Sequence, residues 1–248
     1  MTFLRSLLFF LVLFIITPPF SLVAIVARMV LPPRMRYRVI GIWTHLVMWS
    51  LQYIVGLRHR VIGTENLPRG KAIVLCKHQS AWETLALQVF LPPVAFVFKR
   101  ELLRIPFFGW GLGCMPMIAI DRGAGKDALA QVEEQGRRLL DLGFWVTVFP
   151  EGTRMPPGQT RRYKVGGARL AEVTGVPVVP IAHNAGDFWK RNAFLKHPGV
   201  ITVSIGPAID TRGLTAEQIN GQAQVWIEGE MRRLFPHHYE AHSLSATA

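Results

Sequence analysis

The chain has 248 residues, enough for one well-buried core, and we expect one domain with an accessory segment, not two domains. Half of its residues are apolar, 18% are charged and the net charge is +12, which indicates contact with a membrane and with anionic groups such as lipid headgroups, acidic carrier proteins or nucleic acid. The two cysteines have no ligand partner at close spacing, which argues against a disulfide framework and a zinc site and fits a reducing compartment.

The chain begins with a long apolar stretch. Residues 6–27 carry no charge between Arg5 and Arg28, and at about 1.5 Å of rise per residue they form roughly 33 Å of helix, enough to cross a bilayer. A cleaved signal peptide is disfavoured, because the run is long and lacks a cleavage site with small residues. We favour a single span, but Thr17 and Pro18 form a helix-start pattern, so two short helices in a re-entrant hairpin remain an alternative.

Basic and aromatic residues around this stretch indicate how it is oriented. Arginines at positions 28, 34, 36 and 38 follow it, whereas Arg5 alone precedes it, so the rest of the chain is expected on the cytoplasmic face of a membrane. Residues 39–57 are also uncharged, but polar residues interrupt them and Trp43, Trp49 and Tyr53 favour an interfacial helix over a second span. We therefore assign residues 1–57 to an N-terminal membrane segment and interfacial helix.

From residue 58 short apolar runs alternate with amphipathic stretches, which is typical of an α/β domain. Strands are predicted at residues 61–63 or slightly longer, 72–76, 95–98, 117–120, 145–149, 178–182 and 201–205. Helices are predicted at residues 80–91, 125–142 and 165–174, and from a capping box at Thr215 and Gln218 to about residue 234. This domain covers residues 58–236, and residues 237–248 form a polar tail.

The first candidate site is His78, which directly follows the predicted strand 72–76. Histidine titrates near neutral pH and can take a proton from an alcohol. Glu83, one helical turn into the next element, could hold the ring in one tautomer and stabilise its protonated form. One histidine near one acid is more often structural than catalytic, so other residues must support this assignment.

Two further motifs also follow predicted strands. Residues 149–154 form the first, in which Gly152 allows a ligand to approach the backbone, Thr153 offers a hydroxyl and Arg154 offers a planar fork for phosphate oxygens. Arg122 follows another strand and would add a second arginine. Ligands collect at the carboxyl ends of strands in open α/β sheets, so these residues are expected on one rim. Taken singly, residues 149–154 slightly favour a plain surface turn, and Arg122 favours a salt bridge over a phosphate ligand.

The order of these motifs is more specific than any one of them. Along the chain come the pair His78 and Glu83, then residues 99–102 with 105–109, 119–122, 149–154 and 176–180. This order, over about residues 70–185, resembles the 1-acylglycerol-3-phosphate acyltransferase family of the glycerolipid acyltransferase superfamily. The resemblance implies a single mixed-sheet domain like that of glycerol-3-phosphate acyltransferases. It also implies acyl transfer from acyl-CoA or acyl-carrier protein to lysophosphatidic acid, giving phosphatidic acid without a metal, a cofactor or a covalent enzyme intermediate.

The resemblance assigns roles to individual residues. It implies that His78 is the base on the acceptor hydroxyl and that Glu83 stands where the family usually has aspartate. Glutamate is one methylene longer and needs a different rotamer, and we expect the pair to survive. The residues implied to contact the glycerol phosphate are Glu151, Gly152, Thr153, Arg154 and Arg122, with Lys99 as a weaker candidate. The implied partners are membrane lipids, lysophosphatidic acid and the acyl donor, and no nucleic acid.

Several alternatives remain open. Cys76 lies two residues before His78 on the same strand face and could form an acyl-enzyme. The acceptor could be another lysolipid. A membrane-tethered, non-enzymatic binder of anionic lipid or nucleic acid would use the +12 charge, although no nucleic-acid module is recognisable. Its basic cluster would be Arg161, Arg162, Lys164 and Arg169, which in an enzyme could instead dock the phosphates of CoA or an acidic carrier protein. The tail histidines 237, 238 and 242 could bind a metal weakly, but a solvated tail is the simpler interpretation.

Overall fold

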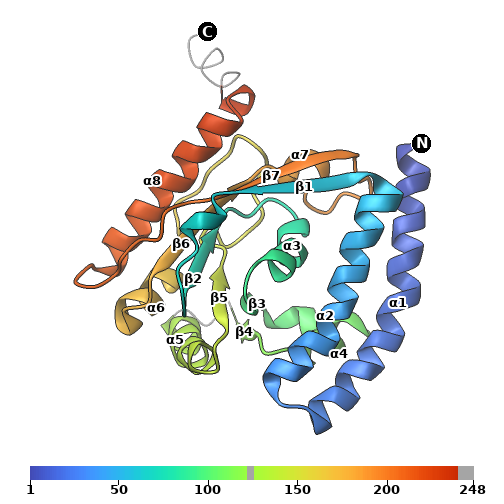
Figure 1. Cartoon of the computed structure of the whole chain (residues 1–248), viewed down its shortest axis with the longest axis horizontal. Coiled ribbons are helices and arrows are strands. Elements are labelled where there is room, and N and C mark those ends of the chain that lie inside the picture. The colour runs from blue at the N-terminus through green and yellow to red at the C-terminus, as the bar shows by residue number, and fades with distance from the viewer. Residues whose placement is uncertain (122–125, 240–248) are drawn as a thin grey trace.

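The computed structural model describes residues 1–121 and 126–239, and its centre is one seven-stranded sheet (Figure 1). The strands are β1 (Leu57–Ile62), β2 (Ile73–Cys76), β3 (Val94–Lys99), β4 (Ile118–Ile120), β5 (Trp145–Val148), β6 (Val178–His183) and β7 (Gly199–Ile205). Their order across the sheet is β1-β7-β6-β2-β5-β3-β4. The predicted mixed α/β sheet is confirmed, with a strand at every predicted place.

Strand direction divides the sheet into two parts. Strands β6, β2, β5, β3 and β4 pair in parallel, whereas β7 runs antiparallel to β6 and pairs in parallel with β1. Every residue of β2 and β6 is buried, as continuous apolar runs in a parallel sheet predict. The five parallel strands therefore end at one common edge of the sheet.

The helices cover both faces of this sheet. Four lie where the sequence predicts them: α3 (Trp82–Phe90), α5 (Lys126–Asp141), α6 (Gly166–Thr174) and α8 (Ala216–Leu234). Both hydrogen bonds of the capping box at Thr215 and Gln218 are formed. Two short helices, α4 (Phe108–Cys114) and α7 (Ala185–Phe188), were not expected, because they are too short to show a helical period. Residues Thr64–Asn66 (η2) and Arg100–Arg104 (η3) form single 3-10 turns.

Two buried clusters make this a three-layer structure, with helices α5, α6 and α8 on one side of the sheet and helices α1, α2 and α3 on the other (Figure 1). The cluster under α5, α6 and α8 includes Val132, Leu170 and Ile227, one residue from each of these helices. The cluster on the other side of the sheet includes Val47 of α2 and Trp82 of α3. Both faces of the sheet are therefore shielded from water, and its carboxyl edge stays available for a site.

The N-terminal region is a pair of antiparallel helices, α1 (Thr2–Val30) and α2 (Pro33–Ser50), followed by a π-helical turn, η1 (Leu51–Val55) (Figure 1). Helix α1 continues through Pro18 and Pro19. The alternative of two short helices that meet at Thr17 is therefore not formed. The Thr17 hydroxyl instead donates to the carbonyl of Leu13 at 2.6 Å. The chain reverses direction only at residues 31–32, after the end of α1, and not near Thr17 as the hairpin alternative required.

Helix α1 is the one described helix that is long and apolar enough to cross a membrane, and it lies along the rest of the molecule. Near its start, Ser6 accepts a hydrogen bond from the Lys196 amide at 2.9 Å, and Phe9 is fully buried against Trp189. Near its end, the Ser21 hydroxyl donates to the Phe107 carbonyl. Its opposite face exposes large apolar side chains, namely Phe3, Leu4, Leu8, Phe10, Leu11, Phe14, Ile15, Leu22, Val23, Ile25 and Val26. An exposed apolar surface of this size marks an interaction surface, and it is consistent with association with a membrane.

Candidate active site

The predicted site residues gather at the carboxyl edge of the parallel strands. Lys77 and His78 follow β2, Lys99 ends β3 and residues 149–154 follow β5. His183, at the end of β6, belongs to the same edge. The expectation of a common rim holds for these residues, because parallel neighbours end on the same side. Arg122 lies outside the described residues.

His78 and Glu83 form the hydrogen-bonded pair that the sequence predicts. The Glu83 Oε1 atom lies 2.8 Å from His78 Nδ1 and also accepts from the amides of Gln79 and Ser80, at 2.9 and 2.8 Å. Burial of this inaccessible carboxyl raises its pKa, but His183, His78 and the Ser80 amide outweigh burial, so the pKa of Glu83 is lowered. Glu83 is therefore an acceptor in its ionised form, and the proton of the neutral His78 ring lies on Nδ1.

This arrangement leaves the other ring nitrogen available. His78 Nε2 has no hydrogen-bond partner among the described residues, and 12% of the side chain is accessible to solvent. The ring stacks on Phe149 with 4.1 Å between centroids and 17° between planes. The imidazole is thus held in one orientation, and its Nε2 is left without a partner among the described residues, as a general base requires.

The loop after β5 holds the backbone of His78 from both sides. The His78 amide donates to Glu151 Oε2 at 2.8 Å, and the His78 carbonyl accepts from the Met155 amide at 2.7 Å. Gly152 has φ +69°, and an added Cβ there would lie 3.0 Å from Lys164 Cε. The left-handed backbone therefore favours glycine here, and an added Cβ would require the flexible end of Lys164 to shift.

Lys77 forms a buried charge cluster with two glutamates, which the sequence did not reveal. Its Nζ atom lies 2.7 Å from Glu151 Oε1 and 2.8 Å from Glu228 Oε1, and the side chains of Lys77 and Glu151 are inaccessible to solvent. Tyr163 donates to Glu228 at 2.9 Å. Burial raises the pKa of Glu151 to about 7, against the opposing effect of Lys77. The Glu151 carboxylate is therefore engaged inside the protein, and it links helix α8 to the backbone of His78.

His183 is a second residue that the sequence reasoning missed. Its Nδ1 accepts from the Ala185 amide at 3.2 Å, so its Nε2 carries the proton and donates to the Lys77 carbonyl at 2.8 Å. Burial lowers the pKa of this inaccessible ring, more than Glu83 raises it. His183 thus fixes the backbone of the residue before His78. Its position three residues after the 176–180 block, directly after a predicted strand, was the available signal.

The predicted phosphate ligands lie on the same rim. Arg154 and Thr153 are partly exposed, and Lys99 is exposed. Burial lowers the pKa of Arg154, Glu83 opposes this effect, and the like charge of Arg191 adds to it. No carboxylate of the described residues forms an ion pair with Arg154 within 4.0 Å. The guanidinium is therefore available for an anion, while the contacts of these residues with a substrate remain predictions.

Cys76 lacks the surroundings of a nucleophile. It is fully buried, and its thiol donates to the Lys77 carbonyl at 3.2 Å. Burial raises the pKa of Cys76 well above its usual value, and the charges of Glu83 and Glu151 raise it further. A buried thiol that stays protonated cannot readily attack a substrate, so the geometry argues against the acyl-enzyme alternative.

Known proteins resemble this chain in sequence and in fold. Residues 58–184 match the sequence profile of the family described as Acyltransferase. The 1-acyl-sn-glycerol-3-phosphate acyltransferase of Pseudomonas aeruginosa is 42% identical over 236 residues, which cover 94% of this chain and 92% of that protein. The human 1-acyl-sn-glycerol-3-phosphate acyltransferase alpha is 32% identical over 180 residues, or 70% of this chain and 62% of that protein. The crystal structure of the 1-acyl-sn-glycerophosphate (LPA) acyltransferase from Thermotoga maritima has the same fold, with a TM-score of 0.78 over 94% of this chain and 95% of that one, at 22% identity.

Proposed function

The chain belongs to the 1-acylglycerol-3-phosphate acyltransferases of the acyltransferase family, and from this premise we propose how it acts as an enzyme. It transfers a fatty acyl group to the free hydroxyl of 1-acyl-glycerol-3-phosphate and forms phosphatidic acid. The observation that carries this function is the His78 and Glu83 pair at the carboxyl edge of the sheet, on the same rim as the unpaired Arg154. This is the chemistry that acylation of a phosphate-bearing alcohol requires.

His78 is the general base in the proposed reaction. Its Nε2 takes the proton of the acceptor hydroxyl as the oxygen attacks the thioester carbonyl, and the tetrahedral intermediate then breaks its carbon–sulfur bond. The thiolate leaves and takes the proton from His78, so the ring returns to its neutral form. The Glu83 carboxylate stabilises the charged ring between these two steps. A thioester is already activated, so the co-substrate is acyl-CoA or acyl-carrier protein and no further cofactor is needed.

Arg154 binds the phosphate of the acceptor in this proposal. Its guanidinium fork suits two phosphate oxygens, and the backbone at Gly152 and the Thr153 hydroxyl are on the same loop. Lys99, from the neighbouring strand β3, adds positive charge to the rim. Arg122 is a further candidate that lies outside the described residues. For Glu151 we propose a positioning role, because its carboxylate bonds Lys77 and the His78 amide.

The N-terminal helices keep the enzyme at its lipid substrate. We place the exposed apolar face of α1 in the bilayer, with the catalytic domain on the cytoplasmic side. The arginines at positions 28, 34, 36 and 38, around the turn between α1 and α2, support this orientation, because basic residues favour the cytoplasmic leaflet.

Replacement of His78 tests the function. The purified full-length chain in detergent micelles is assayed with labelled acyl-CoA and with acyl-carrier protein against lysophosphatidate and lysophosphatidylcholine. We expect transfer to lysophosphatidate, which His78→Ala abolishes and which the exposed-surface control His197→Ala leaves unchanged. More than a few per cent of parent activity in His78→Ala would rule out its role as the base. Preference for lysophosphatidylcholine would favour the alternative acceptor class.

A further inference from the structure

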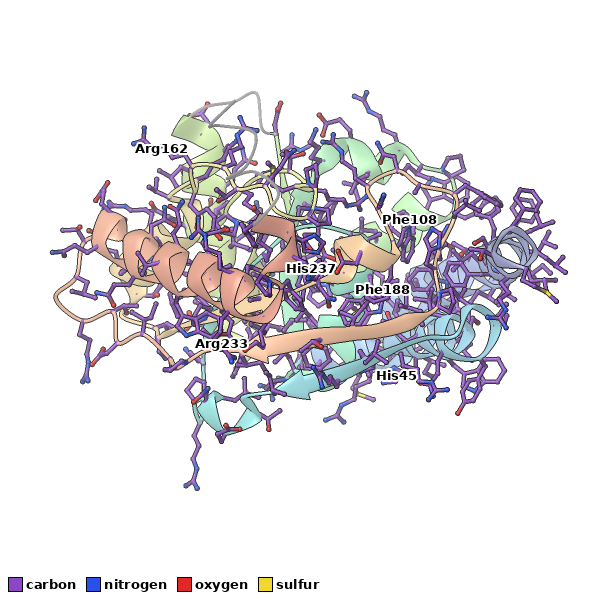
Figure 2. The ribbon with its side chains drawn as sticks, turned by 90° about the horizontal axis from the view of Figure 1, so that it is seen from above. His45, Phe108, Arg162, Phe188, Arg233 and His237 are labelled. Atoms are coloured by element: carbon purple, nitrogen blue, oxygen red, sulfur yellow. The ribbon has the colours of Figure 1, made fainter. Side chains whose placement is uncertain are left out.

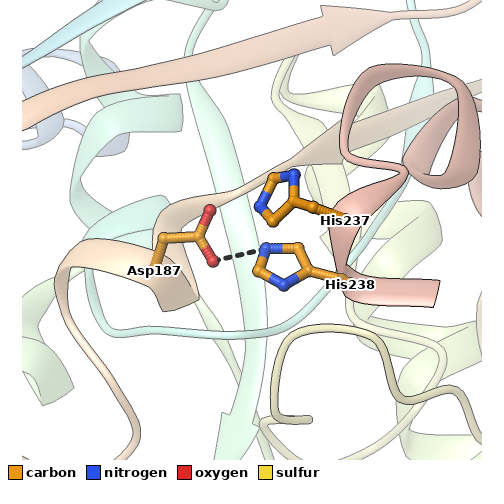
Figure 3. Close-up of side chains that lie close together, drawn as sticks. All are labelled: Asp187, His237 and His238. Carbon is orange, nitrogen blue, oxygen red and sulfur yellow. Dashed lines mark ion pairs between the residues drawn. The ribbon is translucent and has the colours of Figure 1, made fainter. Parts of the chain in front are cut away.

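A cluster outside the catalytic residues brings two histidines to one carboxylate. Asp187 of helix α7 and the consecutive residues His237 and His238, which follow α8, place their ligand atoms within 4.8 Å of one another (Figure 3). Figure 2 shows His237 between α8 and α7. About fifty residues separate Asp187 from the histidines, so the fold and not the local sequence makes this cluster, which we call the His-His-Asp cluster.

The carboxylate of this cluster is held in a fixed orientation. Asp187 Oδ2 accepts a hydrogen bond from Asn184 Nδ2 at 3.0 Å, and Asn184 Oδ1 in turn accepts from the Thr202 amide of strand β7 at 2.9 Å. The other oxygen, Oδ1, is directed at His238 (Figure 3). Hydrogen bonds that orient a carboxylate in this way are typical of the residues behind metal ligands.

One histidine nitrogen of the cluster is poorly satisfied by the protein alone. His238 Nε2 is inaccessible to solvent and lies 2.7 Å from Asp187 Oδ1, but it makes no hydrogen bond of acceptable geometry. The rings of His237 and His238 lie 4.0 Å apart, so two protonated rings would repel each other. In its neutral form, each imidazole can offer one lone pair to an ion. An ion pair between His238 and Asp187 would explain why these two side chains lie together, but it would not explain why His237 lies beside them.

We propose that Asp187, His237 and His238 bind a Zn²⁺ ion. Two imidazole nitrogens and one carboxylate oxygen suit zinc, whereas Mg²⁺ and Ca²⁺ prefer oxygen ligands. Tetrahedral zinc with bonds of about 2.1 Å needs ligand atoms roughly 3.4 Å apart. The cluster therefore tightens on binding, which the exposed His237 ring permits. A fourth position remains for water.

The bound ion joins the C-terminal end of the described chain to the catalytic edge of the sheet. The Gly186 amide, next to Asp187, donates to the side chain of Gln79 at 3.1 Å, and Gln79 follows the catalytic base. On the other side, the His238 carbonyl packs against Gly158, in the loop that supports His78. Zinc thus stabilises the segment after α8 that covers these elements, without touching the substrate.

Zinc titration of the full-length chain, purified without a histidine tag and stripped with EDTA, tests the site. We expect one Zn²⁺ per chain, with affinity lowered about tenfold or more by Asp187→Asn and by His237→Ala. The matched control is His197→Ala, an exposed histidine outside the cluster. His237→Ala is the discriminating variant, because it leaves the contact between Asp187 and His238 intact. Absence of binding by the parent, or unchanged affinity in His237→Ala, overturns the proposal.

Limited proteolysis gives an independent readout. Arg232 and Arg233, near the end of α8, are exposed trypsin sites whose cleavage requires local opening of the helix. We expect zinc to slow cleavage there in the parent and in His197→Ala, but not in His237→Ala. Equal protection by zinc in all three proteins would show that the ion acts elsewhere and would also overturn the proposal.

Discussion

Glu83→Gln is the sharpest test of the catalytic pair. The amide keeps the size of the side chain and can still accept from the Gln79 and Ser80 amides, but it removes the negative charge that lies 2.8 Å from His78 Nδ1. A charge-assisted hydrogen bond contributes about 1.5 to 3 kcal/mol, which corresponds to roughly a 10- to 150-fold loss of rate at 1.4 kcal/mol per factor of ten. Loss of the carboxylate partner of a catalytic histidine can cost up to about 10⁴-fold, so the expected loss of kcat is tenfold or more.

The companion variant Glu83→Asp tests the length of the side chain. Removal of one methylene withdraws the carboxylate by about 1.5 Å, which breaks the direct bond unless helix α3 shifts. We expect activity above that of Glu83→Gln and at or below that of the parent.

Initial rates at saturating acyl donor and lysophosphatidate, with circular dichroism to confirm folding, provide the measurement. The matched control is Glu134→Gln on the exposed face of α5, which we expect to keep parent activity. If Glu83→Gln and Glu83→Asp both run at parent speed while His78→Ala is inactive, the carboxylate has no part in catalysis.

Three further changes test the phosphate ligand, the buried charges and the lipid surface. Arg154→Ala should raise the KM for the acceptor by about 10- to 150-fold with little change in the donor KM, because one charge-assisted bond of about 1.5 to 3 kcal/mol is lost. Arg154→Lys should restore only part of the affinity, and equal effects on both substrates would assign Arg154 to another role. Lys77→Met should lower the free energy of unfolding by about 3 to 5 kcal/mol, because it leaves two glutamates unpaired in the interior. Adding Glu228→Gln should recover part of that loss in denaturant unfolding, and an additive double variant would contradict the coupling. The double change Phe14→Lys and Ile15→Lys, at side chains 72% and 67% exposed, should weaken binding to zwitterionic vesicles, which do not attract the added lysines, by at least about 100-fold, since each loses about 1.5 to 3 kcal/mol of burial in lipid. Activity in micelles and thermal stability should stay near the parent values, and unchanged vesicle binding would show that this face of α1 does not enter the bilayer.

Patterns among residues that are close in the sequence predicted much of the fold. The apolar runs at residues 72–76 and 178–182 became β2 and β6, because strands buried on both faces need an unbroken apolar sequence. The capping box at Thr215 started α8, because both of its bonds join residues three positions apart. At Thr17 the start pattern, which the sequence offered only as the alternative to one continuous helix, does not begin a new helix, and α1 continues through it.

The candidate pair shows the same limit within the site. Glu83 was recognisable because it lies five positions from His78, so one turn at the start of α3 brings the two side chains together. Lys77 and His183 were overlooked, because their roles depend on partners 151 and 106 positions away. Nothing in the local sequence around Glu228 or Lys77 indicates that they form a buried ion pair.

The sequence by itself determined the order of the strands and of the four longer helices of the domain, the His78 and Glu83 pair, and the motif order that indicated the family. Only the tertiary structure decided that Glu151 bonds inward to Lys77 and to the His78 amide, that Cys76 is inaccessible, and that Asp187 meets the two tail histidines. The physical reason is one of range. Periodicity and capping act between residues a few positions apart, whereas burial, ion pairing and pKa shifts depend on neighbours that only the packed chain brings together.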